Sequence, residues 1–148
     1  MSSEALFVHI SQAIVKEQLF LDPAFDRQAA IDRFHLSKER IGAAFAQGSD
    51  YASITDFINE CRLEYAVTLL RDQPSLPITH VAQASGFSDA NYFGRKFKVR
   101  FGLSPTDMQL NGKTFTKDNV PYLLADDLKE MKTTRVSDSE FIVNLITE

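Results

Sequence analysis

The sequence predicts an all-α protein, and three observations support this prediction. Apolar residues recur every three or four positions through residues 1–111, as they do on one face of a helix. Serines stand before several of these stretches and glycines after them, where helices are commonly capped. No segment of 1–111 alternates apolar and polar residues at period two, so no strand is expected there.

The chain has 148 residues, which suits one domain or at most two small ones. No run approaches the roughly 18 apolar residues of a membrane span, and the first residues lack the basic and apolar regions of a secretory signal. One cysteine excludes an internal disulfide and fits a reducing compartment, so we expect a cytoplasmic protein. No residues have the spacing of zinc ligands or of a catalytic group, so we expect no metal, no cofactor and no enzyme activity.

Residues 1–23 predict one helix that packs over a core. Its apolar side chains share one face and are Leu6, Phe7, Ile10, Ala13, Ile14 and Phe20. Asp22-Pro23 ends this segment. Because the chain has twelve phenylalanines and no tryptophan, we expect phenylalanine to fill much of the core.

Residues 24–50 predict a first lobe of two short helices. The first runs from Asp26 to Phe34. Ser37 is a suitable N-cap for the second, from Lys38 to Gln47, which Gly48 ends. His35 falls where the first helix needs a left-handed residue, a conformation that histidine tolerates better than most residues.

Residues 53–71 predict a long linker helix capped by Ser53. Its apolar stripe consists of Ile54, Phe57, Ile58, Cys61, Tyr65, Leu69 and, as a further candidate, Ala66. No residue that would activate the thiol of Cys61 is evident, so Cys61 is expected in the core.

Residues 77–110 predict a second lobe of three short helices. Pro77 suits the first turn of one helix, which reaches Ser85, and Gly86 supplies a left-handed residue after it. Ser88 is expected to cap a helix that runs to Phe101 and stops at Gly102. Ser104-Pro105 then begins the last helix.

Residues 111–148 form an acidic tail. Their pattern is compatible with a helix over 120–131 and with a strand or a docking helix over 141–146. No role follows from the tail sequence.

Residues 30–37 and 81–88 form an internal repeat. Each copy has small or apolar residues, a turn, a buried apolar residue and then a serine, and each is followed by a helix with a phenylalanine one face-repeat later, Phe45 and Phe97. A helix, a tight turn and a second helix make a helix-turn-helix unit. The sequence therefore predicts two such units joined by the linker helix.

Two such units on one long helix resemble the AraC/XylS family of bacterial transcription regulators. The resemblance covers residues 24–110. On the linker helix the matching residues are Arg62-Leu63-Glu64-Tyr65-Ala66 and Leu69-Leu70. Further along it consists of Ile78, Val81-Ala82, Gly86-Phe87-Ser88-Asp89, Tyr92-Phe93, Phe97-Lys98, Phe101-Gly102 and Ser104-Pro105. It implies that the second helix of each lobe enters a DNA major groove, with the two helices about 34 Å apart in successive grooves.

The resemblance also implies partners. Double-stranded DNA with a bipartite site is the first, RNA polymerase is a candidate second partner, and no membrane contact is implied for this segment. Family members usually carry a sensing domain, so the chain is either a piece of a larger regulator or a stand-alone protein.

The second helix of the second lobe, which would enter the major groove and is called the reading helix, lies in a short basic segment. From Ser88 to Phe101 there are four basic residues and one acidic residue. Tyr92, Phe93, Phe97 and Phe101 are predicted to face inward, and Asp89, Ala90, Asn91, Gly94, Arg95 and Lys98 outward. Arg95 can bind guanine O6 and N7, Asn91 can pair with adenine or cap the helix, and Ala90 can contact a thymine methyl. Lys98, Lys96 and Arg100 suit phosphates.

The reading helix of the first lobe departs from the family pattern. Its predicted outward residues are Lys38, Glu39, Gly42, Ala43 and Ala46. Glu39 could accept a hydrogen bond from cytosine or repel phosphate, and Arg40 could contact the DNA backbone. Either this lobe docks weakly on DNA and tolerates differences in DNA shape, or it packs and positions the protein and recognises few bases. Backbone N–H groups at Ser37 and Ser88 would suit phosphates.

The total charge supports a second hypothesis. A net charge of −4 is unusual for a nucleic-acid-binding module, which is commonly basic. The helix-turn-helix scaffold could instead bind another protein, or the acidic tail could cover the basic helix and mask DNA binding.

Overall fold

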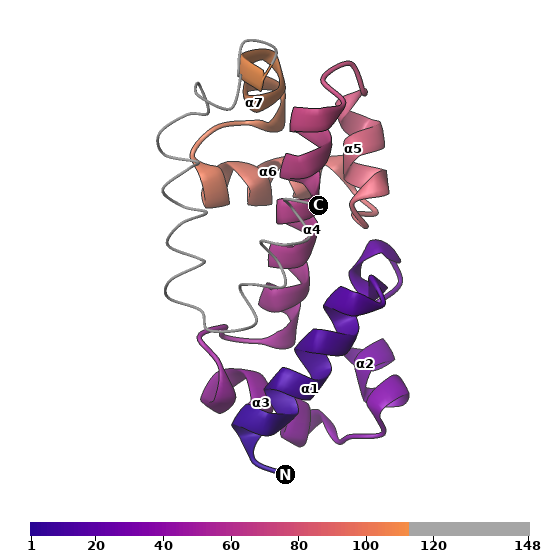
Figure 1. Ribbon diagram of the computed structural model, residues 1–148, viewed down its shortest axis with the longest axis vertical. Helices are drawn as coiled ribbons and strands as arrows, with labels where there is room; N and C mark the ends of the chain where they lie inside the picture. Colours follow the sequence, from indigo (N-terminus) through magenta and orange to yellow (C-terminus); the bar gives the residue numbers. More distant parts are fainter. Residues whose placement is uncertain (113–148) are drawn as a thin grey trace.

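The computed structural model describes residues 1–112, and every regular element in that range is a helix (Figure 1). The helices are α1 (Ser3–Lys16), η1 (Leu19–Leu21, a 3₁₀ turn), α2 (Arg27–Phe34), α3 (Lys38–Gly48), α4 (Ile54–Asp72), α5 (Ile78–Ala84), α6 (Ala90–Phe101) and α7 (Pro105–Gly112). The predicted all-α class is therefore confirmed for this part of the chain. The predictions for 120–131 and 141–146 lie outside the described residues.

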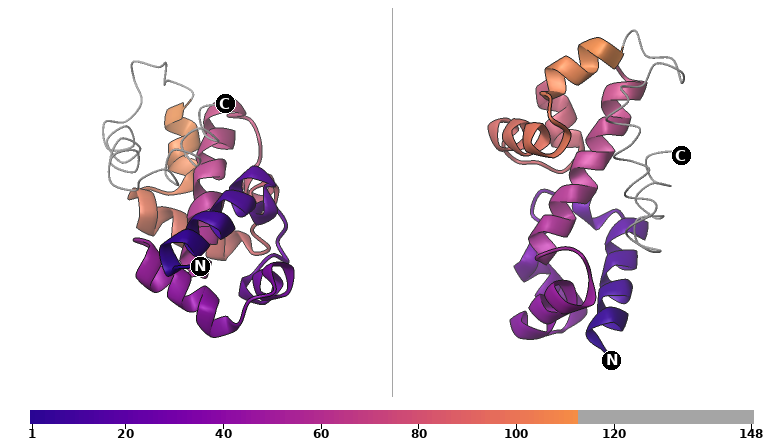
Figure 2. Two further views of the ribbon diagram at one scale, coloured as in Figure 1. Left: turned by 60° about the horizontal axis from the view of Figure 1, so that its bottom comes forward. Right: turned by 90° about the vertical axis from the view of Figure 1, so that its left-hand side faces the viewer.

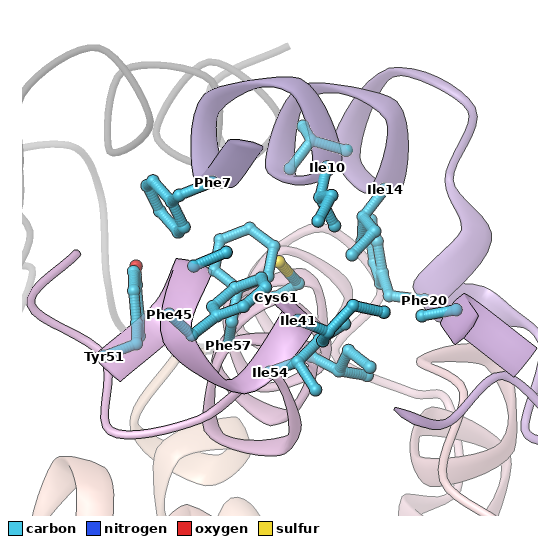
Figure 3. Close-up of a cluster of buried hydrophobic side chains, with 14 of the residues drawn as sticks. Phe7, Ile10, Ile14, Phe20, Ile41, Phe45, Tyr51, Ile54, Phe57 and Cys61 are labelled. Carbon is cyan, nitrogen blue, oxygen red and sulfur yellow. The ribbon is translucent and has the colours of Figure 1, made fainter. Parts of the chain in front are cut away.

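The first apolar cluster lies between α1, α3 and the N-terminal half of α4 (Figure 3). Aromatic rings pack edge to face in it, with ring centroids 5.1 Å apart for Phe7 and Phe45 and 5.0 Å apart for Tyr51 and Phe57. Since Phe7 belongs to α1, the N-terminal helix is part of the core of the first lobe.

The second apolar cluster lies between the C-terminal half of α4 and helices α5, α6 and α7. Phe93, Phe97 and Phe101 run along one side of α6 and are all buried. Ring centroids of neighbouring members are 5.6 and 4.7 Å apart. This side of α6 faces inward, as its apolar spacing predicts.

Helix α4 contributes to both clusters. For this reason, the apolar stripe predicted for α4 is wrong in its C-terminal half. The stripe holds as far as Cys61, whose side chain is fully buried. Beyond that point Leu63 and Val67 are buried, whereas Tyr65 and Leu69 are only partly buried. The reason is that the second lobe packs on a different face of α4 from the first lobe, so that no single stripe describes the helix.

The turns follow the sequence at most positions. His35, Gly86 and Gly102 adopt left-handed conformations, with φ of 53°, 99° and 81°. Helix α3 continues one residue beyond the predicted end, because Gly48 is its last residue and Ser49 is the C-cap. A Cβ atom at position 48 would collide with the backbone of Ser3, so this glycine permits the close approach of α1 and α3.

A buried arginine holds the loop between α1 and α2. Arg62 of α4 donates hydrogen bonds from Nε to the carbonyl oxygen of Phe20, at 2.7 Å, and from Nη2 to those of Asp22 and Phe25, both at 3.0 Å. Burial lowers the pKa of Arg62, although nearby negative groups oppose this effect. The charged guanidinium is retained inside the protein because backbone carbonyls replace its hydration.

We expect Phe97→Ala to lower the free energy of unfolding by about 3–5 kcal/mol, because it empties a large volume in the second cluster. Val99→Ala is the matched control on the same helix, since the Val99 side chain is 86% exposed; its effect should stay within about 0.5 kcal/mol. Denaturant titration followed by circular dichroism measures both. Equal effects of the two substitutions would contradict the inward orientation of Phe97.

Candidate nucleic-acid interface

Helix α6 is capped by Asp89, and the prediction that Ser88 caps it was wrong. Oδ1 of Asp89 accepts hydrogen bonds from the backbone N–H groups of Asn91, at 2.8 Å, and Tyr92, at 3.0 Å. These two hydrogen bonds lower the pKa of Asp89. A carboxylate one residue after the serine is the better acceptor for two donors, and it leaves Ser88 exposed before the helix.

The outer face of α6 is polar and accessible. Ala90, Asn91, Arg95 and Lys98 are exposed, on the opposite side from the buried phenylalanines. Among residues 1–112, neither Arg95 nor Lys98 has a hydrogen-bond or ion-pair partner, so both side chains are available to a ligand. Position 94 is open as well, since a Cβ atom on Gly94 would meet nothing within 4 Å.

Two other basic residues of α6 interact with the protein itself. Nε of Arg100 lies 2.8 Å from Oε1 of Glu60 on α4, and the guanidinium carbon is 4.8 Å from the Phe101 ring centroid. The Arg100 side chain is only 21% exposed, so its geometry does not favour the phosphate contact predicted for it. Lys96 is exposed, with Nζ 5.6 Å from the Tyr92 ring centroid.

Sequence reasoning missed the two α4 residues that anchor α6. Glu60 forms the ion pair with Arg100, and Nδ2 of Asn59 donates a hydrogen bond to the hydroxyl of Tyr92, at 3.0 Å. Both Asn59 and Glu60 are buried. Buried polar groups require partners, but α4 also carries Asp56, Arg62 and Glu64, so no local pattern distinguishes Asn59 and Glu60 in the sequence.

Helix α3 presents a different surface. Ser37 caps it as predicted, with Oγ accepting from the backbone N–H of Arg40 at 3.1 Å. Lys38, Glu39, Gly42 and Ala46 are exposed, while Ala43 is partly buried. Nη2 of Arg40 donates to the carbonyl of Met1, at 3.2 Å, which draws this side chain toward the N-terminus.

The two helices lie on the same side of α4, with α3 beside its N-terminal end and α6 further along (Figures 1 and 2). A groove of about 370 Å³ separates them and is lined by the turn after α3, by α4 and by one side of α6. The outer faces of α3 and α6 are thus two separate surfaces carried by one rod-like helix.

Other candidate chemistry has little support in the described residues. Residues 1–112 contain no group of histidine, cysteine, aspartate and glutamate side chains that could hold a metal ion. Burial raises the pKa of the Cys61 thiol, and the charges of Glu64 and Glu60 raise it further, so the thiol stays protonated. No helix within 1–112 is both long enough and apolar enough to cross a membrane. The masking role considered for the tail concerns residues that lie largely outside this range.

Comparison with known proteins gives consistent matches. A family profile described as a helix-turn-helix domain matches residues 31–111. The HTH-type transcriptional regulator YijO of Escherichia coli is 32% identical over 105 residues, which are 71% of this chain and 35% of YijO. The transcriptional activator RhaS of Escherichia fergusonii is 33% identical over 84 residues, covering 55% of this chain and 29% of RhaS. The porin thermoregulatory protein EnvY of E. coli is 41% identical over 58 residues, covering 38% of this chain and 22% of EnvY.

A solved structure has the same arrangement of helices. The C-terminal domain of the two-component response regulator yesN from Fusobacterium nucleatum superimposes with a TM-score of 0.62 at 26% sequence identity. The match covers 68% of this chain and 95% of that domain. By contrast, the aligned region spans only about a third or less of the length of YijO, EnvY and RhaS.

We expect Asp89→Ala to lower the melting temperature at neutral pH, because two backbone donors at the start of α6 lose their acceptor. The folded-state pKa of Asp89 is lowered, so its contribution is fully present above the unfolded-state pKa of about 3.9 and is lost as the pH falls through the folded-state value. The difference between wild type and Asp89→Ala should therefore shrink in acid.

Thermal melts across a pH series test this prediction. Asp89→Asn should retain most of the stability, since asparagine also caps helices, and should remove the acid dependence that arises from this residue. Ser88→Ala is the control and should leave the melting temperature unchanged. A larger loss in Ser88→Ala than in Asp89→Ala would show that the cap is assigned wrongly.

Proposed function

The chain belongs to the AraC-type helix-turn-helix family, and on this basis we propose that it is a DNA-binding domain of a bacterial transcription regulator. In this proposal α3 and α6 enter successive major grooves on one face of duplex DNA. The observation that carries the proposal is the outer face of α6, where Arg95 and Lys98 are exposed and have no hydrogen-bond or ion-pair partner within residues 1–112. Since the named relatives are transcription regulators, neither an enzyme nor a protein-interaction module is favoured.

We assign the reading of base edges chiefly to α6. Arg95 can donate two hydrogen bonds to guanine, while the ammonium of Lys98 suits a phosphate. Because Asp89 caps the helix, the side chain of Asn91 is not needed as a cap and remains exposed for adenine. Ala90 is also exposed and can contact a thymine methyl group. Lys96 is accessible to the DNA backbone, whereas Arg100 serves to hold α6 on α4.

Helix α3 is proposed to dock in the groove with few base contacts. Gly42, Ala43 and Ala46 offer no side-chain hydrogen bonds, and the charges of Lys38 and Glu39 oppose each other. The N–H groups at the start of α3 suit a phosphate near Ser37. Sequence preference should therefore be stronger in the half-site that α6 occupies.

The partners of the whole regulator are proposals as well. RNA polymerase and a sensing domain elsewhere in a larger chain are the candidates that family membership suggests. A role on the bacterial chromosome would place the domain in the cytoplasm.

Selection from a random duplex pool at low salt, followed by sequencing of the bound fraction, tests the proposal. We expect a bipartite motif whose halves lie about one helical turn apart, with one half better defined than the other. Retention without enrichment would contradict sequence-specific reading, since phosphate contacts alone do not distinguish sequences. Absence of retention by a folded sample would contradict DNA binding.

We expect Arg95→Ala to cost about 1–3 kcal/mol on the selected duplex and to relax the preference at one base position, because a bidentate contact is lost. Lys98→Ala should weaken binding to all sequences alike and reduce the salt slope by about 1, because a phosphate contact is lost. Fluorescence anisotropy over a range of salt concentrations measures both effects.

Arg33→Ala is the matched control for charge. It removes one cation from α2, a helix that lies away from α6 (Figure 1), and Arg33 is already paired there with Glu17. If Arg33→Ala weakened binding as much as Arg95→Ala, the assignment of α6 as the reading helix would be wrong.

A further inference from the structure

We propose that a joint between the two lobes, formed by Arg62, the carbonyl of Phe20 and Gly86, determines which half-site spacing the domain accepts. The proposal rests on the DNA-binding function proposed above and adds positioning residues to it. None of these three residues lies on the outer face of α3 or α6.

One side of the joint is the set of hydrogen bonds from Arg62. Its guanidinium reaches three carbonyls of one loop, and the shortest bond, at 2.7 Å, goes to Phe20. Arg62 stands on α4 between Cys61, which belongs to the first cluster, and Leu63, which belongs to the second. The loop between α1 and α2 is thereby attached to α4 at the boundary between the lobes.

The other side of the joint is Gly86, in the turn between α5 and α6. A Cβ atom at this position would collide with the carbonyl oxygen of Phe20 and lie 2.9 Å from Nε of Arg62 and 3.2 Å from Cα of Leu21. The same carbonyl oxygen therefore accepts the Arg62 hydrogen bond and touches the turn of the second lobe. The guanidinium carbon also lies 6.0 Å from the ring centroid of Phe87, the next residue in that turn.

These contacts fix α6 relative to the first lobe. On α4, the Glu60–Arg100 ion pair and the Asn59–Tyr92 hydrogen bond hold α6 from one side, and the joint holds the turn that precedes it. One base pair moves a half-site by about 3.4 Å along the duplex and rotates it by about 34°. A rigid joint should therefore tolerate one spacing, and a displaced or loosened joint should shift or broaden that preference.

Gly86→Ala places a methyl group in the joint, and Gly102→Ala is its matched control. Both glycines have positive φ, 99° and 81°, so alanine is strained at either position, but a Cβ at 102 would meet nothing within 4 Å. Arg62→Lys is a second, independent variant, since lysine retains the charge but lacks the fork that reaches three carbonyls. If Gly86→Ala does not fold, Arg62→Lys carries the test.

The joint is tested first without DNA, by the distance between two spin labels on the full chain. Ala46→Cys on α3 and Val99→Cys on α6 supply exposed attachment sites, and the fully buried Cys61 should remain unlabelled. We expect a narrow distance distribution in the parent and in Gly102→Ala, and a shifted or broadened one in Gly86→Ala and in Arg62→Lys. Distributions that match the parent in both joint variants would overturn the proposal.

Spacing preference is then measured with duplexes that the unlabelled parent selects from a random pool. Insertion or deletion of one base pair between the two half-sites should lower the DNA affinity of the wild-type protein and of Gly102→Ala at least about tenfold. A loss of this size is expected when one helix loses its base contacts. In Gly86→Ala and Arg62→Lys, either the preferred half-site spacing should change, or the loss of DNA affinity for a one-base-pair change should fall to threefold or less. The second outcome differs from the wild-type loss by about 0.7 kcal/mol or more. An unchanged spacing profile in both joint variants would overturn the proposal.

The two readouts separate failure of the joint from failure of DNA binding. If the parent retains no duplex, the proposed function fails, and the distance measurement alone decides whether the joint fixes the lobes. If the parent binds and both joint variants show its distances and its spacing profile, the joint proposal fails and the DNA-binding function stands.

Discussion

The structure depends on the buried guanidinium of Arg62, which lies in the middle of α4, the helix that connects the two lobes. Burial of this charge costs free energy that its contacts must offset. A buried charge is tolerated only when polar groups replace its lost hydration, and three hydrogen bonds from Arg62 to carbonyl oxygens of the loop between α1 and α2 serve this purpose. The loop enters the 3₁₀ turn through Gln18, which has a left-handed conformation with φ of 53°. It also leaves no room for a side chain at position 86. The lobes consequently form one unit even though their apolar clusters are separate.

The basic residues of α6 divide between internal and external roles. Arg100 is held by Glu60 and lies near the Phe101 ring, whereas Arg95 and Lys98 remain exposed, with no hydrogen-bond or ion-pair partner in residues 1–112. Charge alone therefore overstates the DNA-facing surface of this helix. In the proposed complex with DNA, the small side chains of α3 and the opposite charges of Lys38 and Glu39 offer few base contacts, so we expect the two lobes to contribute unequally to specificity.

Local features of this fold were predictable from sequence, and long-range contacts were not. The caps Ser37 and Ser53, the left-handed His35 and Gly86 and the end of α6 at Gly102 depend on neighbouring residues, and all were predicted. The inward and outward faces of α6 also follow from helical spacing. The Arg62 hydrogen bonds and the close contact at Gly48 join segments far apart in the chain, where no local pattern signals them. Asp89 was missed because two consecutive residues could each cap α6, and only the geometry distinguishes them.

In the proposed complex, one rigid unit presents α3 and α6 to the same face of DNA. Hydroxyl-radical footprinting of the full chain on a selected duplex tests it most directly. We expect two protected segments on each strand, about one helical turn apart, on one face of the duplex. Protection of a single segment, or of two segments on opposite faces, would contradict it.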